Sequence, residues 1–532
     1  MSAFTGTGTL IRFTLLRDRL RMAIWVVALA GLTAASVPAL DDIFSDQAER
    51  QARAALMDSP TGIVFGGPGY GLDDYTLGPM LVNELTMSLL IALAVMSVLH
   101  VVRHTRAEEE SGRAELLRAG VLGASAQTAA ALITLALTNL LIGGLITATM
   151  VVFDLPAADS TVYGLGLALA GISFGAIAAV CAQVSEHGRS ASGLAFLIIG
   201  VLFLFRAVGD MAEEGGNALS WLSPFAWVQQ TRPFDEPRWE PLALYGAFVL
   251  VLFVVTYALA RRRDVGAGLV AARPGPPDAG RLLRGVLTLH ANQQRGAIVA
   301  WVVAVLAFGY AFGSLVTEVE GMLDSAPDLA AILGGDTDDL VDGFLGMIAA
   351  YVIMAAAAYG VLSVSRARTE ENAGRAELLL STAVGRVHWC GAALVVAVVS
   401  TVLITLSGGL GLGLGAAVAL EDAQWTWRMV ESMLAQLPAA LVFGAIAALL
   451  LGVAPRLLPL VWLWFGYSLV ATMLGALFEF PEEAMKLSAF EILARPPMEG
   501  FETAPYLLYL GAVLVAGAVS LAGFRDRDLV TA

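Results

Sequence analysis

Apolar residues run through this chain in long blocks that are separated by short polar stretches. A helix that crosses the hydrocarbon core of a bilayer needs about 20 predominantly apolar residues. Strict alternation of apolar and polar positions, which is typical of a transmembrane β-barrel, is absent. The pattern therefore predicts an all-α polytopic membrane protein with about 12 transmembrane helices. The expected spans are residues 22–40, 79–101, 127–151, 162–184, 191–209, 241–260, 297–317, 343–364, 389–417, 432–453, 457–476 and 504–523.

One polar stretch between two such blocks occurs twice. Residues 106–117 read RAEEESGRAELL and residues 368–379, 262 positions later, read RTEENAGRAELL, with nine of twelve positions identical. We call these the bridge segments, because each connects two predicted membrane helices. On a regular helix, at about 100° per residue, Glu108, Gly112 and Glu115 would share one face.

Two further echoes support an internal duplication. The sequence FGAIAA occurs at 174–179 and 443–448, and LSPF at 222–225 is matched by LSAF at 487–490. An even number of spans per copy makes the two copies parallel, as in repeats related by an axis along the membrane normal. We therefore expect two tandem six-helix halves with pseudo-two-fold symmetry. The expected domains are a first half at 1–263, a cytoplasmic linker rich in proline and glycine at 264–280, and a second half at 281–532.

The polar segments outside the spans have patterns of their own. Residues 2–21 mix leucine and phenylalanine with arginine, which is typical of an interfacial helix, and 281–296 is its counterpart. Residues 41–56 and 318–333 predict amphipathic helices on the outer side. The aromatic stretch WLSPFAWVQQTRPF at 221–234 would lie in or re-enter the outer leaflet. It could form part of a substrate gate or anchor the interface as an aromatic belt.

Composition and charge agree with this class and add an orientation. The chain is 58% hydrophobic and only 14% charged, against about 25% charged in soluble domains. With the N-terminus in the cytoplasm, 23 of the 31 basic residues fall on the inner side, as the positive-inside rule requires. Both termini are then cytoplasmic and the net charge of −15 belongs to the outer face. We expect a multi-pass protein of the bacterial plasma membrane that binds no nucleic acid.

Catalytic chemistry is not indicated. Lys486 is the only lysine and no Gly-Lys-Ser/Thr sequence is present, so the chain lacks a Walker A loop. Cys181 and Cys390 lie in or beside spans and are interpreted as small apolar side chains. The histidines show no nucleophile-base or metal-ligand spacing. We predict no catalytic residues, no metal and no cofactor in this chain.

The bridge motif EExxGRAELL resembles the coupling helix of type-two ABC exporter permeases, and the fused two-half length is similar to the subgroup that exports polyketide antibiotics, such as the tetronasin-type permeases. The resemblance covers nearly the whole chain. It implies a permease subunit that moves bulky amphipathic compounds (an antibiotic, a drug or a lipid) outward. The implied partners are two ABC ATPase subunits, or a dimer of one, which carry the ATP and Mg. By this resemblance the residues in contact with the ATPases are Glu108, Glu109, Gly112, Arg113, Glu115, Glu370, Glu371, Gly374, Arg375 and Glu377. Arg113 and Arg375 depart from the threonine of many single-half relatives.

The resemblance also implies a substrate path between the halves, walled by the second and fifth helices of each. Candidate path residues are Glu84, Met87, Phe203, Tyr351, Met354, Trp462 and Phe465. Glu84 is a carboxylate within a span, which is costly near the bilayer centre. It could contact substrate, pair with Arg206, or extend outward to the interface. Packing against lipid explains most of the apolar candidates equally well.

Two other functions remain open at this stage. An ion-coupled secondary transporter of twelve helices would need charged coupling residues within its spans, and Glu84 is essentially the only one. A membrane scaffold or sensor that follows ATPase motion without moving cargo is the other alternative.

Overall fold

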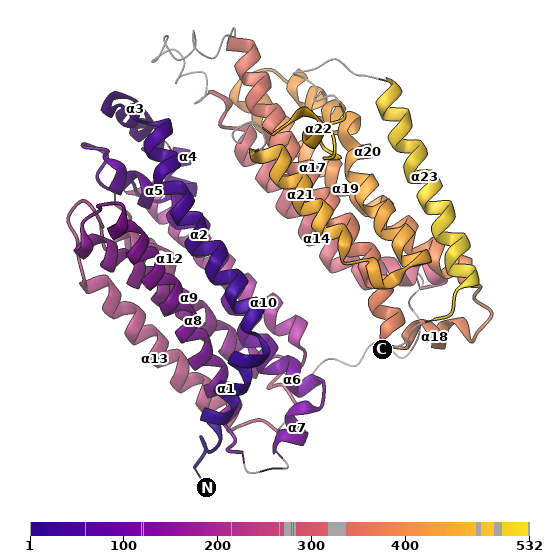
Figure 1. The fold of residues 1–532 in the computed structure, drawn as a ribbon, viewed down its shortest axis with the longest axis horizontal. Helices are drawn as coiled ribbons and strands as arrows, with labels where there is room; N and C mark the ends of the chain where they lie inside the picture. Colours follow the sequence, from indigo (N-terminus) through magenta and orange to yellow (C-terminus); the bar gives the residue numbers. More distant parts are fainter. Residues whose placement is uncertain are drawn as a thin grey trace. The chain divides into compact units, whose positions relative to one another are not determined.

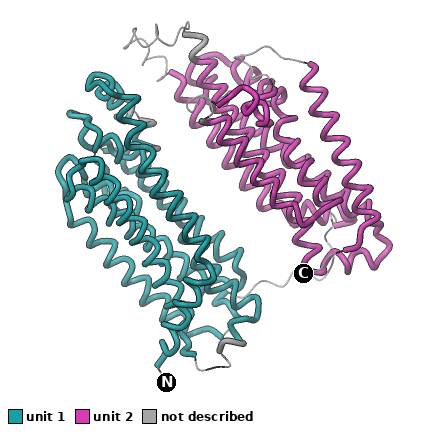
Figure 2. Tube along the Cα trace, in the orientation of Figure 1, with its two compact units in different colours: residues 1–275 teal, residues 276–532 magenta. Residues whose placement is uncertain are grey.

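In a computed structural model the chain forms two compact units, residues 1–275 and 276–532 (Figure 2). The structure describes residues 2–58, 60–118, 120, 122–213, 215–264, 266–270, 278, 280, 283–317, 337–474, 480–493 and 503–529. Within these residues, 12 helices are long and apolar enough to cross a membrane, and no named strand occurs. This confirms the predicted all-α polytopic fold.

Unit 1 holds six of these long helices together with shorter ones at both ends (Figure 1). Its helices are α1 (Thr7–Arg17), α2 (Arg19–Ile43), α3 (Gln47–Met57), α4 (Pro60–Gly66), α5 (Leu77–His104), α6 (Arg106–Glu110), α7 (Arg113–Arg118), α8 (Ala126–Val152), α9 (Ala157–Val184), α10 (Gly188–Ala212), α11 (Ala218–Trp221), α12 (Pro224–Gln229) and α13 (Glu240–Ala260). Within this unit, α1, α6 and α7 lie at one end and α3, α4 and α12 at the other (Figure 1).

Unit 2 holds the other six long helices, with α18 at one end and α22 at the other (Figure 1). Its helices are α14 (Val286–Gly313), α17 (Thr337–Asn372), α18 (Arg375–Leu380), α19 (Arg386–Ala419), α20 (Gln424–Val453), the 3₁₀ helix η1 (Pro455–Leu457), α21 (Leu460–Leu474), α22 (Glu482–Met485) and α23 (Thr503–Asp526).

Small residues bring the long helices close together. Gly143 on α8 and Gly164 on α9 face each other, so a Cβ on either would overlap the carbonyl oxygen of the other. In unit 2, α19 packs closely on α14, where Gly309 and Gly313 meet the backbone of residues 408–416. Apolar burial provides little drive between helices in lipid, so such close packing is a main source of cohesion.

The chain preceding each first span differs between the units. In unit 1 the predicted interfacial segment is a separate helix, α1, which ends before Asp18 and packs through Leu10 on α8. In unit 2 the counterpart at 281–296 is not separate, because α14 runs unbroken from Val286 into the membrane span. That part of the expectation is wrong. The interfacial stretch, although it contains polar residues such as Gln293 and Arg295, continues into the span as one helix.

The segments predicted to lie on the outer side are described only in part. The amphipathic helix expected at 41–56 is α3, which begins at Gln47, while Asp41 and Asp42 end α2. The counterpart expected at 318–333 lies outside the described residues, as does most of the predicted linker at 264–280.

The aromatic stretch of unit 1 packs inside its own unit. Phe225 and Trp227 on α12 are 1% and 6% exposed. The Phe225 ring lies 4.9 Å from that of Phe174, and the Trp227 ring 4.9 Å from that of Tyr245. Phe225 and Phe174 belong to the two sequence echoes, so these echoes meet in space.

In unit 2 the second copies of the two repeated sequences also contact each other. The rings of Phe443 and Phe490, from the second copies of both echoes, lie 4.9 Å apart. The Tyr509 hydroxyl donates to the carbonyl of Ala489 at 3.1 Å, as the Tyr245 hydroxyl donates to that of Pro224 at 2.6 Å. The repeated motifs are therefore one packing unit, in which the outer segment is fastened onto the fourth and sixth spans of each half.

Candidate functional site

Each bridge segment is bent at its glycine. Gly112 has φ of 75° and Gly374 has φ of 72°, both in the left-handed region, where a residue with a Cβ costs about 1–2 kcal/mol. In unit 1 the bend separates α6 from α7, and in unit 2 it separates α17 from α18. The expectation of one continuous helical face through Glu108, Gly112 and Glu115 is therefore wrong. The glycines serve to turn the chain, since nothing lies within 4 Å of where their Cβ atoms would be.

The second glutamate of the first bridge segment is held inside unit 1. Glu109 is 8% exposed and accepts from Arg106 at 2.5 Å. Its two carboxylate oxygens also accept from Arg263, just after α13, at 2.7 and 2.8 Å. Arg263 additionally donates to Gln183 near the end of α9 at 2.8 Å. The bridge is thereby fastened to the ends of two membrane helices.

Unit 2 repeats this arrangement with equivalent residues. Glu371 is 1% exposed and pairs with Arg368 at 3.1 Å. It also accepts from both terminal nitrogens of Arg527, at the end of α23, at 2.5 and 2.8 Å. A buried carboxylate is stable only when it is paired and hydrogen-bonded. Glu109 and Glu371 therefore lie within their units and not on an exposed face.

The first glutamates have different partners in the two units. Glu108 pairs with Arg17 of α1 at 2.8 Å. Glu370 accepts two hydrogen bonds from Arg375 of the same bridge, at 2.7 and 2.8 Å. These hydrogen bonds raise the pKa of the Arg375 guanidinium. The first glutamate thus connects the first bridge to the N-terminal helix, whereas in the second bridge it pairs with an arginine of the same segment.

The residues after each glycine alternate between the unit and solvent. Ala114 and Ala376 are 0% and 1% exposed. Arg113 and Glu115 are exposed, and so are Arg375 and Glu377. Neither glutamate forms an ion pair with any residue that the structure describes. The two matched exposed surfaces therefore each carry one arginine and one unpaired glutamate.

Arg263 and Arg527 were missed by sequence reasoning. The signal for them is that Arg-Asp follows the last span of each half, as Arg263-Asp264 and Arg527-Asp528. Charged residues at a span end are so common that this repeat alone does not identify a contact. The structure shows that each arginine reaches the bridge of its own half.

Glu84 is paired with Arg53 and not with Arg206. Its two carboxylate oxygens accept from Arg53 of α3 at 2.6 and 2.9 Å. Burial lowers the pKa of the Arg53 guanidinium and Glu84 more than offsets this, so the net shift is upward. Arg206 on α10 instead pairs with Asp210 at 3.5 Å and donates to the carbonyls of Ile63 and Val64 in α4. The segment α3–α4 thus contacts both α5 and α10 through arginine.

The remaining path candidates occupy the cores and surfaces of their own units. Met87 and Met354 are each 5% exposed and lie within the apolar cores. Phe203 lies 5.6 Å from Phe225, edge to face. In unit 2, Phe465 lies 5.4 Å from Phe443 and 5.7 Å from Trp462, and Trp462 is 36% exposed. Tyr351 is partly buried on α17.

No group of three or more His, Cys, Asp or Glu within the described ranges could hold a metal ion. Cys181 and Cys390 are both buried and unbonded to each other. The ion pairs of Glu108, Glu109 and Glu371 link the bridges to neighbouring helices, which suits the transmission of force between elements.

Comparison with known proteins supplies the family. Residues 283–525 match the family described as the C-terminal domain of the multidrug efflux system permease Rv1217c. The chain is 35% identical over 538 aligned positions to the multidrug efflux system permease protein Rv1217c of Mycobacterium tuberculosis (strain ATCC 25618 / H37Rv). The alignment covers 99% of this chain and 96% of that protein. The chain therefore belongs to the family of multi-pass efflux system permeases that Rv1217c represents.

Proposed function

We propose that this chain is the membrane subunit of an ATP-driven exporter of the type-two ABC class, in its fused two-half form. It carries bulky amphipathic compounds, such as an antibiotic, a drug or a lipid, from the cytoplasm or inner leaflet outward. The relative Rv1217c is named a multidrug efflux system permease, which supports this cargo class. The proposed setting is the bacterial plasma membrane, with both termini in the cytoplasm and a pseudo-two-fold axis relating the halves.

The observation that carries the proposal is the pair of bridge segments. Each places an arginine and an unpaired glutamate on an exposed surface, Arg113 with Glu115 and Arg375 with Glu377. We assign these surfaces to two ABC ATPase subunits, or to the two copies of one, which bind ATP and Mg. Charges of both signs on a short rigid element fix the register of a partner more than they add affinity.

The buried glutamates then have a different role from the exposed ones. Glu109 and Glu371 would transmit force, because each is bonded to the end of its half's last span through Arg263 or Arg527. Glu110 adds a third connection, accepting from the backbone nitrogen of Gly188 at the start of α10 at 3.1 Å. Movement imposed on the first bridge would therefore reach α10 and α13 together. Gly112 and Gly374 provide the turn that presents the exposed residues.

The test is co-purification of the ATPase with a charge-reversed permease, E115K/E377K. Like charges facing each other at an interface cost several kcal/mol, so we expect at least about a tenfold loss of bound ATPase and a matching loss of ATP turnover. The matched control is E213K/E483K, which makes the same charge change at two exposed glutamates away from the bridges. Undiminished complex formation by E115K/E377K would contradict the proposed docking surface.

The ion-coupled alternative is not favoured by the charges within the described spans. Glu84 is neutralised by Arg53, and Asp210 faces Arg206 in the same helix. In reconstituted vesicles with the ATPase present, transport should therefore persist when an ionophore collapses the proton gradient and stop when ATP is withheld. The reverse result would favour the secondary transporter.

A further inference from the structure

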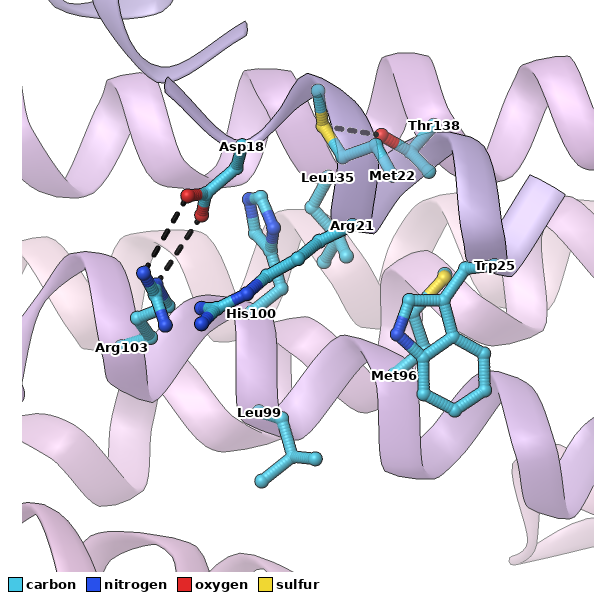
Figure 3. Close-up of a pocket in the computed structure, with 10 residues that line it drawn as sticks. All are labelled: Asp18, Arg21, Met22, Trp25, Met96, Leu99, His100, Arg103, Leu135 and Thr138. Atoms are coloured by element: carbon cyan, nitrogen blue, oxygen red, sulfur yellow. Dashed lines mark hydrogen bonds and ion pairs between the residues drawn. The ribbon is translucent and has the colours of Figure 1, made fainter. Parts of the chain in front are cut away.

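A cavity of about 370 Å³ lies within unit 1 between α2, α5 and α8 (Figure 3). This volume falls within the range of small-molecule sites, which is about 300–1,000 Å³. Ten residues line it: Asp18, Arg21, Met22, Trp25, Met96, Leu99, His100, Arg103, Leu135 and Thr138. None of them belongs to the bridge surfaces or to the path candidates.

The lining changes from polar to apolar along the helix axes. Asp18 precedes α2 and pairs with Arg103 near the end of α5 at 3.2 Å, so the two helices run antiparallel. Trp25 lies seven residues after Asp18, and Met96 lies seven residues before Arg103. Seven residues correspond to about 10 Å along a helix. Figure 3 shows Asp18 and Arg103 at one end of the cavity and Trp25 with Met96 at the other. Such a gradient matches a molecule with a polar head and an apolar body.

The polar end has a surplus of positive charge. Asp18 is 5% exposed. Its carboxylate accepts a hydrogen bond from Nε2 of His104 at 2.8 Å and forms an ion pair with Arg103. His104 must accept at Nδ1, because the group that contacts it there, at 3.1 Å, is the guanidinium of Arg17. Arg21 has no ion pair with any residue that the structure describes. Arg17 also approaches Asp18, at 3.8 Å, but it pairs with Glu108. Among the lining residues Asp18 is thus the one carboxylate against the two arginines Arg21 and Arg103, and one guanidinium has no counter-charge.

The cavity borders an exposed apolar face of unit 1. On α2 the side chains of Leu20, Ile24 and Val27 are 71%, 58% and 70% exposed. Leu99 on the cavity wall is 49% exposed, and the side chain of Arg103 is 41% exposed. The cavity therefore opens at the surface of unit 1, and a lipid molecule can enter it without crossing the core of that unit.

We infer that this cavity is a binding site for a negatively charged phospholipid. The phosphate lies between Arg21 and Arg103. The part of one acyl chain that is nearest to the headgroup lies along Met22, Trp25 and Met96. The shared chemistry is an anionic head on an apolar chain, which amphiphilic cargo could also have. A resident lipid is favoured because the polar end lies at the level where α2 begins and α5 ends, which is the level of a headgroup.

The site is specific to unit 1. If Trp25 is aligned with Trp301, Asp18 corresponds to Gln294 and Arg21 to Ala297. In unit 2 the Trp301 ring packs on Tyr359 at 5.7 Å, and Gln294 accepts from Ser363 at 2.8 Å. At these two aligned positions the second half therefore has neither a guanidinium nor a carboxylate. One high-affinity lipid per chain is expected.

The ion pair between Arg17 and Glu108 connects the surroundings of this site to the first bridge segment. Arg17 contacts His104, the neighbour of Asp18, and also pairs with Glu108 at 2.8 Å. A phosphate bound to Arg103 would compete with Asp18 for that guanidinium. Lipid occupancy is thereby connected to the bridge through Asp18, His104 and Arg17.

The test is native mass spectrometry of the purified full chain, titrated with phosphatidylglycerol and with phosphatidylcholine of identical acyl chains. We expect one phosphatidylglycerol to be retained at least about tenfold more strongly than phosphatidylcholine. R21Q should remove most of this preference, and it breaks no ion pair seen in the structure. The matched control is R12Q/R19Q, which removes two exposed arginines of α1 and α2 that do not line the cavity.

Further arms separate the possible ligands. L135W narrows the cavity between its polar and apolar ends and should weaken retention of both lipids without changing charge. Glycerol phosphate, the headgroup chemistry without acyl chains, should not compete at millimolar concentration, and a cationic amphiphile should not either. Equal retention of the two lipids, a preference that survives R21Q, or an equal loss in R12Q/R19Q would overturn the site. Competition by glycerol phosphate would make it a site for soluble anions and overturn the lipid assignment. If an anionic cargo compound displaced the bound lipid, and phosphatidylglycerol and phosphatidylcholine were retained equally, the assignment to a resident lipid would be overturned.

Discussion

Arg527 and Glu371 are 156 positions apart in the sequence and are joined by two hydrogen bonds of 2.5 and 2.8 Å. This contact fixes the end of the last helix of unit 2 to its bridge segment. Removing one partner of a buried pair leaves an uncompensated charge, which is costly, although Arg368 still faces Glu371. We therefore expect R527Q to lower the free energy of unfolding by about 2 kcal/mol.

The measurement is the melting temperature of the detergent-purified protein. R525Q is the control, because the Arg525 side chain is 75% exposed and its loss should change stability little. The effects of E371Q and R527Q should be less than additive in the double variant, because each substitution removes the same contact. A melting temperature of R527Q equal to that of the unmodified chain would show that the pair is unimportant.

The aromatic cluster at the other end of unit 1 leads to a second prediction. Phe225 is 1% exposed and contacts the rings of Phe174 and Phe203. Truncating a buried phenylalanine to alanine leaves a cavity and costs about 3 kcal/mol. F225A should therefore lower the melting temperature by several degrees. F253A on α13 is the control, because Phe253 is 38% exposed. Equal effects of the two substitutions would contradict the packing role of Phe225.

Most of the fold could be predicted from hydropathy and repetition. Twelve apolar blocks became twelve long helices because each must satisfy its backbone hydrogen bonds internally in lipid. The echoes FGAIAA and LSPF were recognised separately, but their contact through Phe174 and Phe225 required coordinates. Repetition of a sequence shows that the two copies are under a similar structural constraint. It does not show which other segment each copy packs against.

The bridge segments show a different limit. Their duplication was readable, yet the division between buried Glu109 and exposed Glu115 was not. A regular helical projection fails there because Gly112 turns the chain. Arg263, the second partner of Glu109, is 154 positions away, beyond any local pattern. Glu84 was likewise recognisable as an unusual carboxylate, whereas its partner Arg53 was one arginine among many.

The pair between Arg53 and Glu84 gives a third prediction. It holds α3 against α5 through two hydrogen bonds of 2.6 and 2.9 Å, with side chains 32% and 18% exposed. E84Q removes the charge and one of the two strong acceptors. Because solvent screens the pair partly, we expect a loss of about 1 kcal/mol in local stability, or about fivefold faster opening of α3.

Hydrogen–deuterium exchange of residues 47–57 measures this opening. D41N is the control, since Asp41 pairs with Arg50 at 2.7 Å but is 56% exposed, and its loss should change exchange less than about twofold. The exchange of α12 should not change in either variant. Equal exchange of α3 in E84Q and the unmodified chain would show that other contacts hold the outer segment.

The last prediction concerns the closest helix pair of unit 2. A Cβ at Gly411 of α19 would overlap the carbonyl oxygen of Leu306 on α14 and lie 3.0 Å from the backbone nitrogen of Tyr310. Backbone atoms cannot rotate away, so α14 and α19 would have to separate, and G411A should destabilise the protein by about 1–3 kcal/mol. At Gly144 of α8 nothing lies within 4 Å of the same position. There, alanine gains about 0.5–1 kcal/mol of helix propensity over glycine, so G144A should raise the melting temperature or leave it unchanged. The opposite signs of the two substitutions separate helix packing from propensity, and a stabilising G411A would mean that α14 and α19 do not lie in backbone contact in the membrane.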